Sequence, residues 1–134
     1  MELLLDTNIV SYWMRGDEKV ITRMKVCRPC DMAISAITIA EILYGIEKSP
    51  TRKKERREKL DAIRSELELV PFDVLAAEEY GIIRSDLEKK GIPISERDLQ
   101  IAAIARAHNL VVVTHNTKEF KRVFGLKVED WATS

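Results

Sequence analysis

The sequence predicts an α/β fold, a parallel sheet with helices packed on both of its faces. Short apolar runs alternate with longer segments of helical periodicity, and the run at residues 110–114 consists mostly of β-branched residues. Such alternation is typical of strand–helix units, which build parallel sheets. A continuous apolar run is typical of a strand buried on both faces. No internal repeat or long linker divides the chain, so we expect a single domain over residues 1–134.

The first quarter of the chain reads as strand, helix, helix and strand. Residues 2–5 form a short apolar run, and a helix capped by Asp6 follows it to about residue 15, where a glycine ends it. Residues 18–28 carry apolar side chains at helical spacing. Residues 32–36 predict the second strand.

The middle of the chain predicts two helices and a third strand. Residues 38–48 are expected to be helical, and a Ser-Pro pair stops them. Residues 52–68 predict a long charged helix with one apolar stripe. Residues 69–72 read as a strand, but Pro71 has no N–H to donate. This strand should therefore lie at the sheet edge or end early.

The last elements follow from the same signals. Residues 74–90 predict a helix, and Gly91 is placed as the residue that follows its C-terminus. The remaining expected elements are helices at residues 96–108 and 117–123 and strands at residues 110–114 and 126–130.

Bulk properties exclude some classes of function. The net charge is zero, from 22 basic and 22 acidic residues, so any nucleic-acid contact must come from a local patch. No apolar run approaches the ~18 residues that span a bilayer. The N-terminus has no basic region that would begin a signal peptide. We expect a cytoplasmic protein with no membrane contact.

The two cysteines, Cys27 and Cys30, do not predict chemistry. A structural zinc site needs about four ligands. The only histidines, His108 and His115, are seven residues apart and match no zinc pattern. A redox pair should follow a strand and open a helix, whereas Pro29 looks like the end of one. We expect two reduced, half-buried thiols.

Three acidic residues that are far apart in the sequence fall where the fold would bring them together. Asp6 follows the first strand, Glu41 lies in the helix after the second strand, and Asp98 opens the helix before the fourth. Asn116 and Glu119 follow the fourth strand. Ligands of open parallel sheets bind at the carboxyl ends of the strands, so we expect these side chains to share one edge.

Each acid also has a purely structural interpretation. Thr38-x-x-Glu41, Ser95-x-x-Asp98 and Asn116-x-x-Glu119 all resemble capping boxes, in which the two side chains satisfy a helix N-terminus. Asp6 is a suitable N-cap residue. Taken singly, each acid fits a capping role better than a catalytic one. Their joint placement favours chemistry, and capping is compatible with metal binding.

Clustered carboxylates repel one another and resist ionisation unless a cation neutralises them. Oxygen ligands without a thiolate cage indicate Mg²⁺ or Mn²⁺. No cysteine or serine stands beside a histidine in a way that predicts a covalent nucleophile. Attack on a phosphodiester by metal-activated water fits these residues best.

At this point the sequence resembles PIN-domain ribonucleases, specifically the VapC toxin family of type II toxin–antitoxin systems. The resemblance covers essentially the whole chain. It rests on five segments in the family's order and spacing: Leu-Leu-Asp-Thr-Asn-Ile at 4–9, Ile-Thr-Ile-Ala-Glu-Ile-Leu-Tyr-Gly at 37–45, Gly-Ile-Pro-Ile-x-x-x-Asp at 91–98, Val-Val-Thr-His-Asn-Thr-Lys-Glu-Phe at 112–120 and Val-Glu-Asp-Trp at 128–131.

The resemblance implies a three-layer α/β/α sandwich with a five-stranded parallel sheet, and Mg²⁺- or Mn²⁺-dependent endoribonuclease activity. Asp6, Glu41 and Asp98 match the family's metal-binding catalytic acids. Asn116 stands where many members have a fourth acid, and it is expected to be an auxiliary ligand or to position water. Residues with auxiliary roles are Thr7, Asn8 and Glu119.

The resemblance also implies partners. Related toxins cleave the anticodon loop of initiator tRNA, so tRNA is the first expected substrate. A homodimer and a cognate VapB-like antitoxin are expected, the antitoxin packing a helix on the toxin and sending a basic or aromatic side chain toward the acids.

A basic stretch lies outside these motifs. Residues 52–59 carry six basic and two acidic side chains. Phosphate contacts there would make RNA binding salt-dependent, and a solvated helix face is the alternative. The candidate RNA-binding residues are Arg52, Lys53, Arg56 and Arg57.

Two other functions remain open at this stage. An aspartyl-phosphate phosphatase or receiver domain needs a second acid beside Asp6 and a lysine after a later strand, and the Asp6-Thr7-Asn8 segment lacks that acid. A catalytically weak PIN-like module that binds RNA or a protein partner is the second alternative. The three intact acids argue against it.

Overall fold

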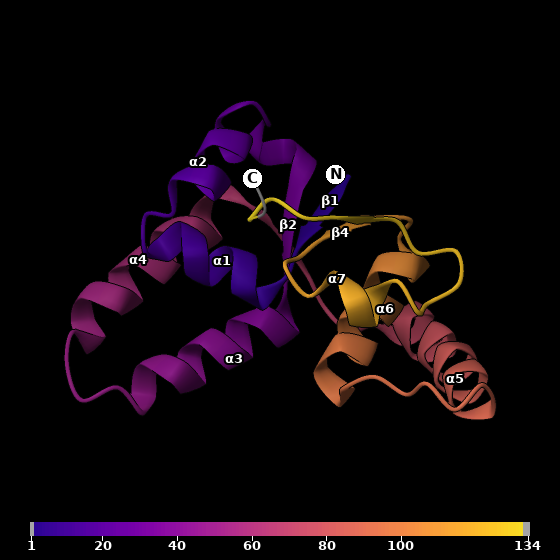
Figure 1. Ribbon diagram of the computed structural model, residues 1–134. Helices are drawn as coiled ribbons and strands as arrows, with labels where there is room; N and C mark the ends of the chain where they lie inside the picture. The colour runs from indigo at the N-terminus through magenta and orange to yellow at the C-terminus, as the bar shows by residue number, and fades with distance from the viewer. Residues whose placement is uncertain (1, 133–134) are drawn as a thin grey trace.

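The computed structural model describes residues 2–132. Its centre is one sheet of five parallel strands in the order β3-β2-β1-β4-β5, which confirms the predicted fold class (Figure 1). The strands are β1 (Leu3–Leu5), β2 (Met32–Ser35), β3 (Glu68–Val70), β4 (Val111–Val113) and β5 (Val128–Glu129).

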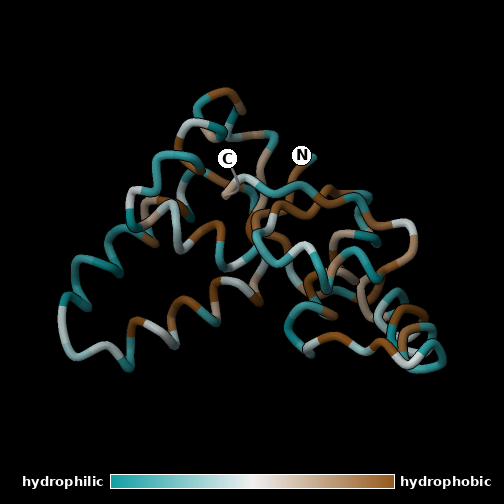
Figure 2. The backbone as a smooth tube through the Cα atoms, viewed as in Figure 1, coloured by the Kyte–Doolittle hydropathy of each residue, from teal (hydrophilic) through white to brown (hydrophobic). Residues whose placement is uncertain are grey.

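Helices cover both faces of the sheet. One face carries α1 to α4, and the other carries α5 to α7 (Figure 1). Hydrophobic residues gather in the central strands, whereas α4 is mainly hydrophilic along its length (Figure 2). The helices are α1 (Thr7–Met14), α2 (Glu18–Lys25), α3 (Ala36–Glu47), α4 (Lys53–Glu66), α5 (Val74–Lys89), α6 (Glu96–Ala107) and α7 (Thr117–Phe120), with a 3₁₀ turn at η1 (Pro29–Asp31).

The central strand β1 is apolar throughout because its side chains pack into the hydrophobic cores on both faces of the sheet. Leu4 packs with α5 and α6, and Leu5 packs with α1 to α4. Successive side chains of a strand point to opposite faces, so both must be apolar when both faces are covered. The next residue, Asp6, therefore emerges at the carboxyl end of the central strand.

The edge strand β3 ends one residue before Pro71. Val70 is its last paired residue, opposite Ser35 of β2. The expected range of residues 69–72 was wrong by one to two residues, because proline cannot donate to the strand ladder. The expectation that this strand lies at the edge and ends early is confirmed.

Four predicted helix boundaries were wrong by two or three residues. The α4 helix ends at Glu66 rather than residue 68, and the α7 helix ends at Phe120 rather than Val123. The α3 helix begins at Ala36 rather than Thr38, because Ser35 Oγ accepts a hydrogen bond from the Thr38 N–H at 3.1 Å and serves as the N-cap. The α2 helix ends at Lys25 rather than Arg28. Arg28 is extended, since proline disfavours the helical conformation in the residue that precedes it.

The predicted stops at two glycines are confirmed. Gly16 and Gly91 have φ values of 81° and 69°, and each follows the residue that caps its helix. Glycine adopts this left-handed conformation without steric strain.

Neither cysteine forms a disulfide. Cys27 is half-buried as expected, but Cys30 is exposed. Burial raises the pKa of the Cys27 thiol, so this sulfur is a poor nucleophile at neutral pH. Separately, none of the helices formed by residues 2–132 is long and apolar enough to cross a bilayer.

Candidate active site

The acidic residues converge where β1, β2 and β4 end. Asp6 directly follows β1, and Asn116 follows β4. Glu41 lies in the second turn of α3, and Asp98 in the first turn of α6. Hydrogen bonds and charge interactions link these side chains, so the shared edge predicted from the sequence exists.

Asp6 is a buried carboxylate with a fixed orientation. Its side chain is 2% exposed. Oδ2 accepts a hydrogen bond from the Thr114 hydroxyl at 2.7 Å, and Oδ1 accepts one from the Thr7 N–H at 2.8 Å. Burial raises its pKa despite these hydrogen bonds. The site thus holds an acid whose negative charge is only partly compensated.

Asp98 is fully buried. Its Oδ2 accepts a hydrogen bond from the Asn116 amide at 2.7 Å. Burial, with the charges of Asp6 and Glu119, raises its pKa to about 6. Because the charge of Asp6 opposes ionisation of Asp98, a cation between the two carboxylates would favour their charged forms.

Glu41 is held by a hydroxyl on one oxygen and by a guanidinium on the other. Oε1 accepts a hydrogen bond from the Thr7 hydroxyl at 2.6 Å, and Oε2 pairs with Arg97 Nη1 at 2.6 Å. Arg97 Nε also lies 3.4 Å from Asp98 Oδ1. The cation beside these acids in this arrangement is therefore a protein side chain.

The donor set suits a hard divalent cation. The candidate ligands are all oxygens. Burial raises the pKa of Asp6 and of Asp98, and a bound cation would favour their charged forms. Within residues 2–132, no three side chains of His, Cys, Asp or Glu are already arranged to hold an ion. The residues fit Mg²⁺ or Mn²⁺ through Asp6 and Asp98, and Glu41 can join them once its ion pair opens.

Two capping boxes predicted from the sequence were wrong in part. Ser95 does cap α6, since its Oγ accepts from the Asp98 N–H at 3.3 Å. The reciprocal acceptor is Glu119, whose Oε1 takes the Ser95 N–H at 2.7 Å. Asn116 does not cap α7 with its side chain. Its amide donates to Asp98 instead, and more weakly to Glu119 at 3.4 Å.

The third box, Thr38-x-x-Glu41, is also absent. Ser35 takes the cap position, and the Thr38 hydroxyl lies 3.1 Å from the Thr7 hydroxyl. Glu41 is thereby free of capping and turns toward the site, where Thr7 and Arg97 hold it. Since Glu41 does not cap the helix, a role as a metal ligand is the better interpretation of this acid.

Thr7 and Asn8 support the site through contacts within the protein. The Thr7 hydroxyl orients Glu41, as described above. Asn8 Oδ1 accepts from the His115 N–H at 3.1 Å and so ties α1 to the segment after β4. Both oxygens already have protein partners, which fits an auxiliary, positioning role.

Two functional residues were missed by the sequence analysis. Thr114 was placed at the end of a strand and within the 112–120 segment but was given no role, yet its buried hydroxyl donates to Asp6 and its Oγ1 also accepts from the Asn116 N–H at 2.9 Å. Arg97 gave no signal because neighbouring residues on a helix point in different directions. Its position directly before a catalytic candidate was the one available hint.

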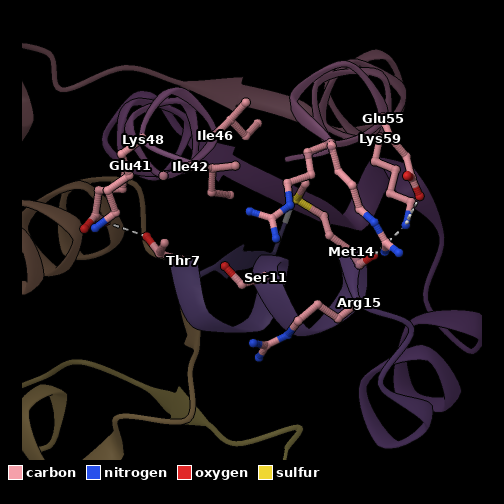
Figure 3. A pocket seen from close by; sticks show the side chains of 13 residues that line it. Thr7, Ser11, Met14, Arg15, Glu41, Ile42, Ile46, Lys48, Glu55 and Lys59 are labelled. Carbon is pink, nitrogen blue, oxygen red and sulfur yellow. Dashed lines mark hydrogen bonds and ion pairs between the residues drawn. The ribbon is translucent and has the colours of Figure 1, made fainter. Parts of the chain in front are cut away.

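A groove of about 550 Å³ leads away from the acids between α1, α3 and α4. Thr7 and Glu41 lie at one end and Glu55 and Lys59 at the other, over an apolar floor that includes Ile42 (Figure 3). The basic side chains that line it are Arg15, Lys48, Arg52, Arg56 and Lys59.

Only half of the basic residues predicted to contact RNA belong to this groove. Arg52 and Arg56 line it, whereas Lys53 and Arg57 do not. Arg57 instead forms an ion pair with Asp61 at 3.3 Å on the exposed side of α4. The helix therefore has a groove-facing basic stripe and a solvated one.

Comparison with known proteins places this geometry in a family. Residues 3–126 match the PIN domain. A tRNA(fMet)-specific endonuclease VapC from Shigella flexneri is 33% identical over 132 residues, which cover 98% of this chain and 99% of that protein. Ribonuclease VapC2 from Rickettsia felis is 39% identical over 133 residues, which cover 98% of each.

Solved structures agree with the sequence relatives. A crystal structure of DNA-bound VapBC from Salmonella typhimurium matches with a TM-score of 0.91 at 36% identity, over 98% of both chains. VapBC2 from Rickettsia felis, bound to a fragment of its promoter DNA, matches with a TM-score of 0.88 at 38% identity, over 98% of this chain and 99% of that one. From its sequence, its fold and its acidic edge, the chain belongs to the PIN-domain family, as a VapC ribonuclease toxin of the VapBC toxin–antitoxin systems.

Proposed function

We propose that this protein is a metal-dependent endoribonuclease that hydrolyses a phosphodiester bond at the acidic edge of its sheet. The observation that carries the proposal is the convergence of two buried acids, Asp6 and Asp98, whose pKa values are raised chiefly because burial disfavours the charged form. Full-length relatives named as ribonucleases support the same reaction class.

Three acids hold the metal in this proposal: Asp6, Glu41 and Asp98. When bound, Mg²⁺ or Mn²⁺ supplies a water of lowered pKa and neutralises charge on the phosphate. The chain's own groups orient the carboxylates. Thr114 fixes Asp6, Thr7 fixes Glu41, and the Asn116 amide fixes Asp98. Because the Asn116 Nδ2 donates to Asp98, its Oδ1 is left to serve as an auxiliary metal ligand or to accept a hydrogen bond from water.

RNA is the substrate that the surroundings of the acids favour. The basic groove begins at Glu41 and can take the phosphates that follow the cleaved bond. Its apolar floor, with Ile42 and Ile46, suits a ribose or base face. Arg52 and Arg56 are the predicted residues that carry this contact. Lys53 and Arg57 contribute less, since they lie outside the groove.

Initiator tRNA is the substrate we propose first, and the cytoplasm, where tRNA resides, is the compartment. VapC proteins of Shigella flexneri and Salmonella typhimurium, 33% and 35% identical, are named tRNA(fMet)-specific endonucleases. At this identity the shared reaction class is better supported than the shared target. Several tRNAs must therefore be offered in any test.

A cognate VapB-like antitoxin and a second copy of this chain are the proposed partners. Similar chains were solved as VapBC complexes bound to DNA. Apolar side chains on α5 are uncovered, with Leu75 55% and Ile82 60% exposed. These two residues lie seven apart, on one helix face. A homodimer that buries this face would remove them from water.

The decisive experiment is cleavage of a total tRNA pool by purified, antitoxin-free protein with Mg²⁺, Mn²⁺ or EDTA. Asp98→Asn is the test variant, and Asp86→Asn, at a half-exposed acid of α5 outside the site, is its matched control. Metal-dependent cutting that only Asp98→Asn abolishes is the expected result. RNA binding without cleavage by any folded variant would favour the catalytically weak binding module instead.

A further inference from the structure

Arg97 contacts two of the three site acids. Its Nη1 lies 2.6 Å from Glu41 Oε2, and its Nε lies 3.4 Å from Asp98 Oδ1. Its charge also acts on Asp6. The guanidinium therefore stands among the negative charges that a divalent cation would neutralise. The two cations are alternatives for the same oxygens.

Glu41 is the oxygen donor for which they compete most directly. Thr7 occupies its Oε1, and Arg97 occupies its Oε2. We propose that Arg97 is a built-in counter-ion that occupies Glu41 in the metal-free protein and is displaced when a divalent cation binds. The proposal rests on the metal dependence proposed above. It makes Arg97 a positioning residue that sets the affinity of the site.

The contacts allow this exchange without unfolding. The Arg97 side chain is 47% exposed, so it can swing into solvent, whereas the Asp98 side chain is fully buried and stays in place. Opening the ion pair frees Glu41 Oε2 while Thr7 still orients the carboxyl group. Half-exposed ion pairs are weak and screened, so a doubly charged ion that gains three carboxylates can displace one.

A permanent structural ion pair is the competing explanation, and the two differ in what metal does to Arg97. Under displacement, the Nε–H of Arg97 leaves Asp98 and becomes exposed as Mg²⁺ is added. Under a permanent pair, that group keeps its partners at every Mg²⁺ concentration. Arg84 is the matched reference, because its Nε donates to Glu88 at 3.2 Å and its side chain is 52% exposed.

The first test follows the arginine Nε–H signals by NMR during a Mg²⁺ titration of the full chain without RNA. We expect the Arg97 signal to move to the position of solvated arginines and to exchange faster with water, while Arg84 is unchanged. An Arg97 signal that does not respond at saturating Mg²⁺ overturns the proposal and leaves the proposed nuclease intact.

The second test measures Mn²⁺ binding by calorimetry for wild type, Arg97→Gln and the control Arg84→Gln. We expect Arg97→Gln to bind Mn²⁺ roughly 1.5- to fivefold more tightly, the range of a half-exposed ion pair, and Arg84→Gln to match wild type. Equal or weaker binding by Arg97→Gln overturns the displacement. Absence of Mn²⁺ binding in all three folded proteins overturns both this inference and the proposed metal dependence.

Discussion

Glu119 Oε1 accepts a hydrogen bond at 2.7 Å from the backbone N–H of Ser95, the residue that caps α6. Burial opposes ionisation of Glu119, but the hydrogen bonds from Ser95 and Asn116 hold its pKa below the usual range. The α7 helix therefore closes the N-terminus of α6, the turn that carries Asp98. This contact joins two segments that each contribute a polar group to the site.

Replacing Glu119 with Ala should loosen that turn. The Ser95 N–H would lose its partner, as when a helix cap is removed, and we expect a stability loss of about 1–2 kcal/mol. Urea unfolding measures it, with Glu88→Ala, at an exposed position of α5, as the control. A loss no greater than that of the control would mean that water replaces Glu119 without penalty.

Asp98→Asn should stabilise the metal-free protein at neutral pH. The folded-state pKa of Asp98 is raised from 3.8 to about 6, so between these pH values the folded protein holds a proton that the unfolded chain has lost. Wild-type stability therefore falls as pH rises through this window, and the full penalty of about 2–3 kcal/mol stands above pH 6.

The pH series separates this effect from a general one. In EDTA, the advantage of Asp98→Asn over wild type should be near zero below pH 3.8, where the carboxyl group is protonated in both states, and should reach its maximum by pH 7. Thermal or urea unfolding across this range provides the measurement. A variant that is less stable than wild type at pH 7 would show that Arg97 and Asn116 already satisfy the carboxylate.

Asn116→Asp should trade metal-free stability for a stronger response to metal. The new carboxylate would face Asp98 and Glu119, where the amide now donates hydrogen bonds. We expect a loss of about 1–3 kcal/mol in EDTA and a larger rise of Tm with Mn²⁺ than in wild type. Asn109→Asp, in a surface turn with φ 55°, is the control. A Tm that rises no more than in wild type would contradict a ligand position at residue 116.

Arg56→Gln should weaken RNA binding, whereas Arg57→Gln should not. Arg56 lines the groove that starts at Glu41, and Arg57 is paired with Asp61 outside it. In an Asp98→Asn background, which under the proposed mechanism does not cleave RNA, loss of one phosphate contact should reduce the slope of log K against log salt by about 0.7. Equal effects of the two variants would indicate a diffuse basic face and no defined groove.

Much of the fold is readable from the sequence because its strands are buried on both faces. A strand such as β1 tolerates only apolar residues, so its position and the placement of Asp6 at its end follow directly. The same reasoning placed Glu41 and Asp98 at that edge. Glu41 lies in the helix that follows β2, and Asp98 lies in the first turn of α6. The early end of β3 was predictable from Pro71 for a chemical reason, its missing N–H.

The hydrogen-bond partners within the site were harder to predict from the sequence. Several side chains of similar chemistry could make each contact, and the tertiary packing decides which one does. Ser35 and Thr38 can both cap a helix, and the sequence does not show that Ser35 does so. The Ser95 N–H donates to the carboxylate of Glu119, 24 residues away, and not to that of Asp98. The reach of Arg97 to Glu41, 56 residues away, likewise depends on how α3 and α6 pack.

The hydrogen bond between Asp6 and Thr114 also bears on how the protein is made. These residues lie 108 positions apart. A ribosome that adds ~5–20 residues per second needs roughly 5–20 s to travel from one to the other. During that interval β1 lacks its neighbour β4, and Asp6 lacks the hydroxyl that orients it. A nascent chain therefore cannot assemble its acidic edge until translation has passed residue 114, so a toxin whose activity depends on that edge, as proposed above, stays inactive through most of its own synthesis.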